Sequence, residues 1–271
     1  MHNVRRPAVA GAFYPGLGSA LSSTIDNLLT TAQSRAGSTA GTPKALIVPH
    51  AGYIYSGPTA ALAYAQLAPA RHTIRRVVLL GPVHRVAVRG LALPGGTAFA
   101  TPLGEIALDL DAVAALAHLP QVITSPAAHA PEHSLEVQLP FLQAVLQDFT
   151  LVPLAVGDAT PAEVAQVLET LWGGPETLVV VSSDLSHFLP YRTAQAIDQD
   201  TVQHILNLDG PISHEQACGG TPVNGLLLAA RLHHLQPRLL GLCSSGDTAG
   251  DKQRVVGYAA IAFTETSHAR H

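Results

Sequence analysis

Four nearly unbroken aliphatic runs constrain the fold of this chain more than any other feature. The runs are ALIVP (45–49), VVLLG (77–81), LVPLAVG (151–157) and LVVVSS (178–183). Strands that are apolar at consecutive positions are covered on both faces, which is typical of parallel sheets rather than of sheets with one wet face. The sequence therefore predicts a buried, mostly parallel central sheet.

Stretches with apolar residues at helical spacing occur among these runs, over 56–67, 109–119, 161–172 and 221–235. Alternation of buried strands with helices predicts an α/β fold with helices on both faces of the sheet. We expect one domain over residues 1–271, with Ser56 as the N-cap of the first of these helices. Residues 97–108 resemble a strand–turn–strand insertion, and residues 255–263 resemble a late strand at the edge of the sheet.

The composition argues against several classes of function. Of the 271 residues, 47% are apolar and 13% are charged, the net charge is −4, and no run of Lys or Arg occurs. A nucleic-acid partner is therefore not expected. No apolar stretch reaches the roughly 18 residues that a membrane span needs, and no signal-peptide pattern opens the chain. Two cysteines do not make a disulfide framework, so we expect a cytoplasmic protein with reduced thiols.

Three histidines follow buried runs at the point where each predicted strand ends. His50 follows ALIVP, His84 follows VVLLGPV, and His187 follows LVVVSSDLS. One such histidine is more often an ordinary loop residue, but three on separate strands are harder to dismiss. Because ligand crevices form at the carboxyl ends of strands in open α/β sheets, we expect these imidazoles to share a site.

Two further segments contain side chains that could bind a ligand or take part in a reaction. In PEHSLEVQLPFLQ (131–143), Ser134 is the expected N-cap of a helix and Glu136 lies in its first turn, which accounts for both but not for Glu132 and His133. In ACGGTPVNG (217–225), Cys218 precedes two glycines and the start of a helix. A helix N-terminus lowers the pKa of a thiol, so Cys218 is a candidate thiolate, whereas a small buried residue is the plainer alternative.

Several of these segments resemble one known family. PHAGYIYSG, LLGPVH, EHSLEVQLPFL, SSDLSHF and CGGTPVNGLL occur in this order after RRPAVAGAFYPG, and together they resemble the Memo family, also called AmmeMemoRadiSam system protein B. The resemblance runs from about residue 4 to residue 263. It implies a fold similar to that of class III extradiol ring-cleaving dioxygenases, which hold Fe(II) with two histidines and a glutamate.

The resemblance also implies roles for individual residues. His50, His84 and Cys218 would be the metal ligands, with the cysteine in place of the dioxygenase carboxylate. His187 would be the acid/base catalyst, with Asp184 on the same wall. The remaining pocket candidates are Tyr53, Tyr55, His133 and Glu136. Fe(II) is the expected metal, with Cu or Zn as alternatives because a thiolate is a soft ligand.

Two main functions are compatible with this site. The first is a non-haem iron oxidoreductase, dioxygenase-like, that acts on an unknown small molecule. The second is a non-enzymatic module that uses the same pocket to bind a peptide or a protein. A zinc hydrolase, with His187 or Glu136 as the base, is a third alternative. The resemblance further implies AMMECR1-like and radical-SAM proteins as partners.

Overall fold

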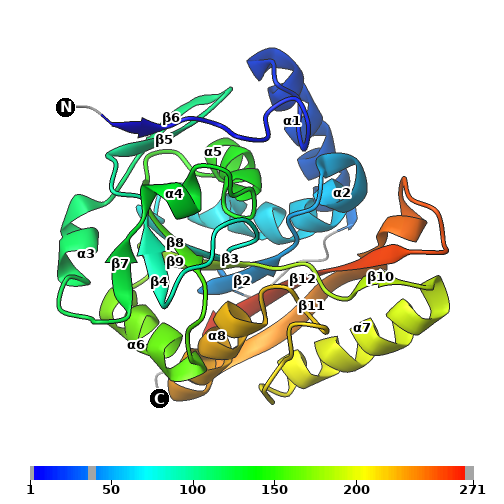
Figure 1. Ribbon diagram of the computed structural model, residues 1–271. Helices are drawn as coiled ribbons and strands as arrows, with labels where there is room; N and C mark the ends of the chain where they lie inside the picture. Colours follow the sequence, from blue (N-terminus) through cyan, green and yellow to red (C-terminus); the bar gives the residue numbers. More distant parts are fainter. Residues whose placement is uncertain (1–2, 36–40, 266–271) are drawn as a thin grey trace, which may run out of the picture.

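A large central sheet organises the protein (Figure 1). The structure is a computed structural model that describes residues 3–35 and 41–265. The middle of the sheet consists of parallel strands in the order β2, β9, β3, β8. Their bounds are Ala45–Val48 for β2, Thr177–Ser182 for β9, Arg76–Pro82 for β3 and Thr150–Val156 for β8. These strands are the aliphatic runs of the sequence, so the predicted α/β fold class and its parallel core are confirmed.

Antiparallel neighbours extend this parallel core on both sides. On one side β12 pairs with β2 and carries β10 and β11, and on the other β4 pairs with β8 and carries β7. The bounds are Val255–Glu265 for β12, His187–Leu189 for β10, Leu235–Ser244 for β11, Leu91–Leu93 for β4 and Val122–Thr124 for β7.

Helices cover both faces of the sheet, as the sequence predicts (Figure 1). One face carries α1 (Gly18–Arg35), α2 (Tyr53–Tyr64), α5 (Leu139–Val145) and the 3-10 turns η1 (Ala65–Ala70) and η2 (Glu136–Gln138). The other carries α3 (Leu110–Ala115), α6 (Pro161–Leu171), α7 (Tyr191–Leu206) and α8 (Gly220–Leu232). The short helix α4 (Pro126–His129) and the turn η3 (Ser245–Asp247) lie in connections.

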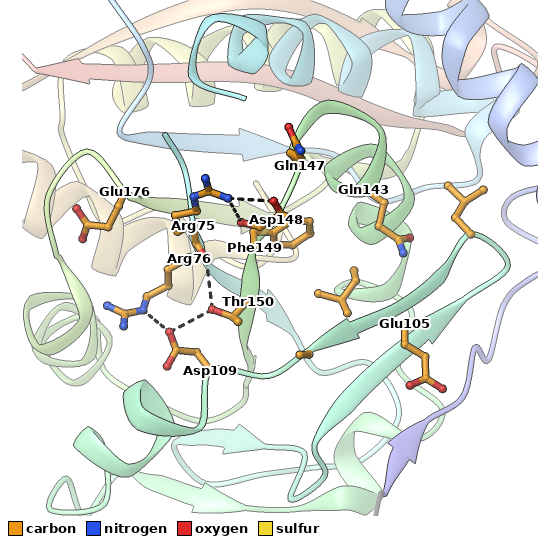
Figure 2. A pocket seen from close by; sticks show the side chains of 13 residues that line it. Arg75, Arg76, Glu105, Asp109, Gln143, Gln147, Asp148, Phe149, Thr150 and Glu176 are labelled. Atoms are coloured by element: carbon orange, nitrogen blue, oxygen red, sulfur yellow. Dashed lines mark hydrogen bonds and ion pairs between the residues drawn. The ribbon is translucent and has the colours of Figure 1, made fainter. Parts of the chain in front are cut away.

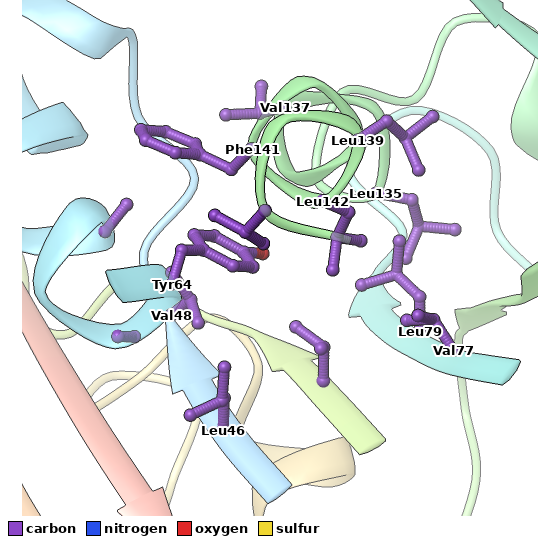
Figure 3. Close-up of a cluster of buried hydrophobic side chains, with 14 of the residues drawn as sticks. Leu46, Val48, Tyr64, Val77, Leu79, Leu135, Val137, Leu139, Phe141 and Leu142 are labelled. Carbon is purple, nitrogen blue, oxygen red and sulfur yellow. The ribbon is translucent and has the colours of Figure 1, made fainter. Parts of the chain in front are cut away.

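Successive residues of each central strand enter opposite cores. In β2, Leu46 and Val48 pack toward α2 and α5, whereas Ala45 and Ile47 pack toward the other helices. Figure 3 shows the first of these cores, where the ring of Tyr64 stacks on that of Phe141 with 5.1 Å between centroids. Burial on both faces is the physical reason why these strands lack an alternating pattern.

A second, small sheet joins the start of the chain to the predicted strand–turn–strand insertion. Strands β5 (Ala98–Thr101) and β6 (Gly104–Ala107) pair antiparallel, and β1 (Val4–Arg5) pairs parallel with β5. This pairing holds the N-terminal segment beside the connection between α4 and η2, where Arg5 donates to the carbonyls of His129 and Glu132. No helix of the described residues is both long enough and apolar enough to cross a bilayer.

Two local expectations were wrong. Helix α2 begins at Tyr53 with Gly52 at its N-cap, so Ser56 is inside the helix, where its hydroxyl donates to the carbonyl of Ala51 at 2.9 Å. Strand β12 is not at the edge, because β2 pairs with it on one side and β11 pairs with it on the other.

We predict that Phe141→Ala lowers the free energy of unfolding by about 3–5 kcal/mol, because the ring is fully buried between Tyr53 and Tyr64 and its removal leaves a cavity. Urea unfolding of both proteins measures the difference. Ile54→Ala is the control: its side chain is 67% exposed, so the change should stay within about 0.5 kcal/mol. Equal effects of the two substitutions would contradict the packing described for this core.

Candidate metal centre

Three imidazoles come together where the parallel strands end. Ring nitrogens of His50, His84 and His133 all lie within 4.8 Å of one another. His50 follows β2, His84 follows β3, and His133 lies in the connection between α4 and η2. Parallel strands bring their carboxyl ends to one edge, so residues far apart in sequence meet there.

A hydrogen-bond network fixes which nitrogen of His50 carries the proton. The Ser182 hydroxyl has a single proton and donates it to the carbonyl of Ser134 at 2.7 Å. It must therefore accept from the Gln138 amide at 2.8 Å and from Nδ1 of His50 at 2.9 Å. Nδ1 thus carries the hydrogen, and Nε2 keeps the free electron pair that a metal needs.

Glu132 is the hydrogen-bond acceptor beside Nδ1 of His84 and His133. Its Oε1 accepts from Nδ1 of His84 at 2.9 Å and lies 3.3 Å from Nδ1 of His133. Burial raises the pKa of the Glu132 carboxyl, but the hydrogen bond and charge of His84 and the backbone N–H groups outweigh it and lower the pKa to about 2. The group is therefore an accepting carboxylate at neutral pH, and in the neutral tautomer with the hydrogen on Nδ1, Nε2 of His84 keeps its electron pair. Carboxylates behind metal-binding histidines commonly have this role.

The two most buried imidazoles of the cluster are neutral. Burial lowers the pKa of His50 well below its usual value, and the charges of His133 and His84 lower it further. Burial, followed by the charge of His84, lowers the pKa of His133 to about 4. Neutral rings offer lone pairs, so this cluster is ready to coordinate a cation at physiological pH.

Cys218 lies beside the cluster. Its Sγ lies 3.3 Å from Nε2 of His50. The two glycines after it allow the close approach, because a Cβ at Gly219 would meet the Ser183 side chain at 2.7 Å and one at Gly220 would meet the Ile212 carbonyl at 2.9 Å.

The expected low pKa of the Cys218 thiol was wrong for the metal-free protein. Burial raises this pKa to about 12, and the charge of Asp184 adds to the effect. Desolvation therefore outweighs the helix N-terminus, since α8 begins only at Gly220. A bound cation would reverse the balance, because a coordinated thiol loses its proton.

His187 and Asp184 occupy different positions relative to this cluster. Nδ1 of His187 donates to the carbonyl of Leu185 at 2.8 Å, so Nε2 is the nitrogen able to take up a proton. The carboxylate of Asp184 accepts a hydrogen bond from the backbone N–H of His50 at 2.7 Å. Burial raises the pKa of Asp184 to about 7, and the carboxyl does not line the cavity described below. Its contacts are those of a residue that positions the end of β2.

The remaining pocket candidates lie around the cluster rather than in it. Tyr53 is buried and donates to the carbonyl of Val137 at 2.9 Å, and Tyr55 is half-buried on the first turn of α2. Glu136 is fully buried and pairs with Arg5, accepts from Tyr14 at 2.5 Å and accepts from two backbone N–H groups.

The expected N-cap role of Ser134 was also wrong. Its hydroxyl donates to the carbonyl of Pro82 at 2.8 Å, and η2 begins beyond it at Glu136. Ser134 therefore ties the segment that carries Glu132 and His133 to the end of β3.

A cavity of about 820 Å³ opens beside the cluster. Its lining residues are His84, His187, Leu189, Ala196, Ile197, Asp200, His214, Glu215, Gln216 and Cys218. Imidazole and thiolate donors suit Fe, Cu or Zn rather than Mg or Ca. The donor set of this cluster is therefore compatible with the first-row metals that the family resemblance implies.

A second hollow, of about 790 Å³, lies at the opposite end of the strands and differs in chemistry (Figure 2). Arg76 pairs with Asp109 at 2.7 Å and Arg75 pairs with Asp148 at 3.3 Å, so its guanidinium groups already have partners. Neither histidine nor cysteine is among the residues that line it. Metal chemistry therefore has its candidate site at the carboxyl edge.

Sequence reasoning left parts of the cluster unassigned. His133 was expected in the pocket rather than among the ligands, and Ser182 and Gln138 were not expected to contribute. The one usable signal was the pair Glu132–His133, which capping did not explain. The roles of Ser182 and Gln138 depend on contacts across 44 to 132 positions of sequence, which local patterns do not record.

We predict that Glu136→Gln lowers the free energy of unfolding by about 3–5 kcal/mol, because it leaves the buried Arg5 charge without its partner. Asp148→Asn breaks an exposed pair and should cost no more than about 1 kcal/mol. Chemical denaturation measures both. If Glu136→Gln instead kept full stability and lost metal, Glu136 would act on the centre directly.

Comparison with known proteins places these observations in a family. The sequence matches the family described as Memo-like protein over residues 5–262. It is 34% identical to a MEMO1 family protein of Metallosphaera sedula, covering 96% of this chain and 99% of that protein, and 36% identical to one of Ignicoccus hospitalis, covering 96% and 98%. An uncharacterized protein, JW3007 from Escherichia coli, aligns over 80% of this chain and 98% of its own with TM-score 0.49 and 16% identity, too distant to bear on function. The chain belongs to the Memo-like family.

Proposed function

We propose that this protein binds a first-row transition metal, Fe(II) in the first place and Cu or Zn as alternatives, and uses it on a small organic molecule. The observation that supports the proposal most is the convergence of three imidazoles with their ring nitrogens within 4.8 Å, beside a thiol 3.3 Å from one of them. Two of these rings have Nδ1 committed to protein acceptors, which leaves Nε2 for a ligand.

The proposed donors are His50, His84 and Cys218, with His133 as an additional nitrogen. Ser182 and Glu132 orient the rings, and the buried carboxyl of Asp184 holds the backbone of His50. A metal bound here would supply Lewis acidity and redox capacity. Nitrogen and sulfur donors do not by themselves determine which first-row metal binds. Elemental analysis of anaerobically purified protein therefore identifies the native metal.

The cavity and His187 complete the proposed mechanism. A substrate in the cavity would contact His84, Cys218 and His187, which all line it. Burial lowers the pKa of His187, so the ring is neutral at physiological pH and can accept a proton at Nε2. The apolar wall formed by Leu189, Ala196 and Ile197 limits the water around that proton transfer.

The non-enzymatic alternative uses the same cavity without chemistry. It requires no metal, so metal content separates the two functions. A protein purified with stoichiometric metal supports the proposal. A metal-free protein that binds a peptide or protein partner with undiminished affinity favours the binding module.

Cys218 and Cys243 should behave differently. Cys218→Ser should lower metal affinity, because a hydroxyl is a poor ligand for soft metals. Cys243→Ser should retain the metal, because the Cys243 thiol contacts the Thr59 hydroxyl (3.0 Å) and not the histidine cluster. Metal should protect Cys218 from alkylation, and a chelator should expose it. Metal stoichiometry and alkylation rates measure this. Equal retention of metal in both variants would remove the thiol from the donor set.

His133 and His187 provide a second matched pair. His133→Ala should reduce metal content, because it removes a nitrogen from the cluster, whereas His187→Gln should retain the metal and, in the presence of a substrate, lower turnover by about 10²–10⁴-fold. Elemental analysis of both variants checks the first part. Loss of metal on His187→Gln would make His187 a ligand and refute its proposed role in proton transfer.

A further inference from the structure

The charges around the cavity beside the cluster are of one sign. Asp200 and Glu215 are among its lining residues, whereas neither Lys nor Arg is. Its other ionisable groups are the imidazoles of His84, His187 and His214 and the thiol of Cys218. A negatively charged group that enters the outer cavity therefore meets two carboxylates and no lysine or arginine from the wall.

One part of the cavity wall is apolar. Helix α7 contributes Ala196 and Ile197, and strand β10 contributes Leu189. Asp200 follows Ala196 by four positions, so it occupies the same face of α7 one turn further along. The apolar patch and an acid are thus presented side by side by one rigid element.

Both acids are available for a ligand. Asp200 has a weak neighbour, Nε2 of His204 at 3.7 Å on the same helix, and both side chains are well exposed. Glu215 bonds locally with Ser213 and lies near His214. Among the described residues, neither carboxylate forms an ion pair with a lysine or an arginine. The outer cavity therefore has uncompensated negative charge.

We propose that this cavity selects small organic cations: molecules with an amine at one end and an apolar body that covers Leu189, Ala196 and Ile197. The amine would lie near Asp200 and Glu215, and the other end of the molecule would reach Cys218 and His84. This inference rests on the function proposed above, since it names the class of substrate for the same site. The inference follows from the acidic and apolar residues that line one cavity. A carboxylate or phosphate ligand would find no lysine or arginine there to pair with.

Three probes with the same ring and different charge test the proposal: phenethylamine, phenethyl alcohol and phenylacetate. NMR titrations at low ionic strength measure their affinities, and shifts of the His84, His187 and His214 ring signals locate the site. Phenethylamine should bind more tightly than phenylacetate, with each exposed carboxylate contributing about two- to fivefold. The preference should shrink in high salt, because exposed charges are screened.

Substitution assigns the effect to the two acids. In the Asp200→Asn, Glu215→Gln double variant the preference for the amine should disappear, while the affinity for phenethyl alcohol should be unchanged. Asp148→Asn, an exposed acid in the other hollow, should keep the preference. Equal affinities in the wild type, a preference for phenylacetate, or a preference that survives in the double variant would overturn the proposal.

The titrations are run with and without a chelator, so that this inference and the proposed function fail separately. Metal-free protein that still prefers phenethylamine supports selection by charge, even if elemental analysis refutes the metal centre. Protein that holds stoichiometric metal but shows no preference for the amine refutes the selection and leaves the metal centre intact.

Discussion

Burial of the central strands on both faces is the constraint on which the rest of the structure depends. Strands β2, β9, β3 and β8 have no wet face, so their polar backbone groups must be satisfied within the sheet and their side chains must divide between two cores. Parallel pairing then brings the chain out of the core at one edge, where polar residues can be placed without burying them in the sheet. His50 and His84 follow β2 and β3 and lie at this edge.

The cluster itself depends on two acceptors that the core supplies. Ser182 is the last residue of β9, and its single proton settles the tautomer of His50. Glu132 stands in a connection, yet it is held by backbone N–H groups of His84, His133 and Ser134. Both acceptors are therefore placed by backbone geometry. A centre built in this way is organised before any ligand arrives, which lowers the cost of binding.

Much of this arrangement could be predicted from the sequence, for a physical reason in each case. The central strands were recognisable because double burial removes the alternating pattern, and His50 and His84 were recognisable because they follow those strands. Strand β12 was misplaced because its run of Gly, Ala and aliphatic residues indicates a strand without indicating its neighbours. The pKa of Cys218 could not be inferred, because burial by distant residues outweighs the adjacent helix.

The same limit explains His133. The local sequence is compatible with a helix start, because serine is a common N-cap residue. In the structure the Ser134 hydroxyl instead donates to the carbonyl of Pro82. A hydrogen bond between residues 52 positions apart is invisible to a local pattern. The hydrogen bonds of Ser134 to Pro82 and of His84 to Glu132 hold this segment beside the end of β3.

The separation of the cluster residues along the chain has a consequence for how the protein forms. His50 and Cys218 are 168 positions apart, and the ion pair of Arg5 with Glu136 spans 131 positions. Contacts of such long range are slow to form, since much of the chain must be ordered before they close. A nascent chain that ends before residue 218 lacks Cys218, so the full set of donors exists only after synthesis has passed that residue. Metal loading through that full set would therefore be a late event, and it would stabilise the finished fold rather than guide its early stages.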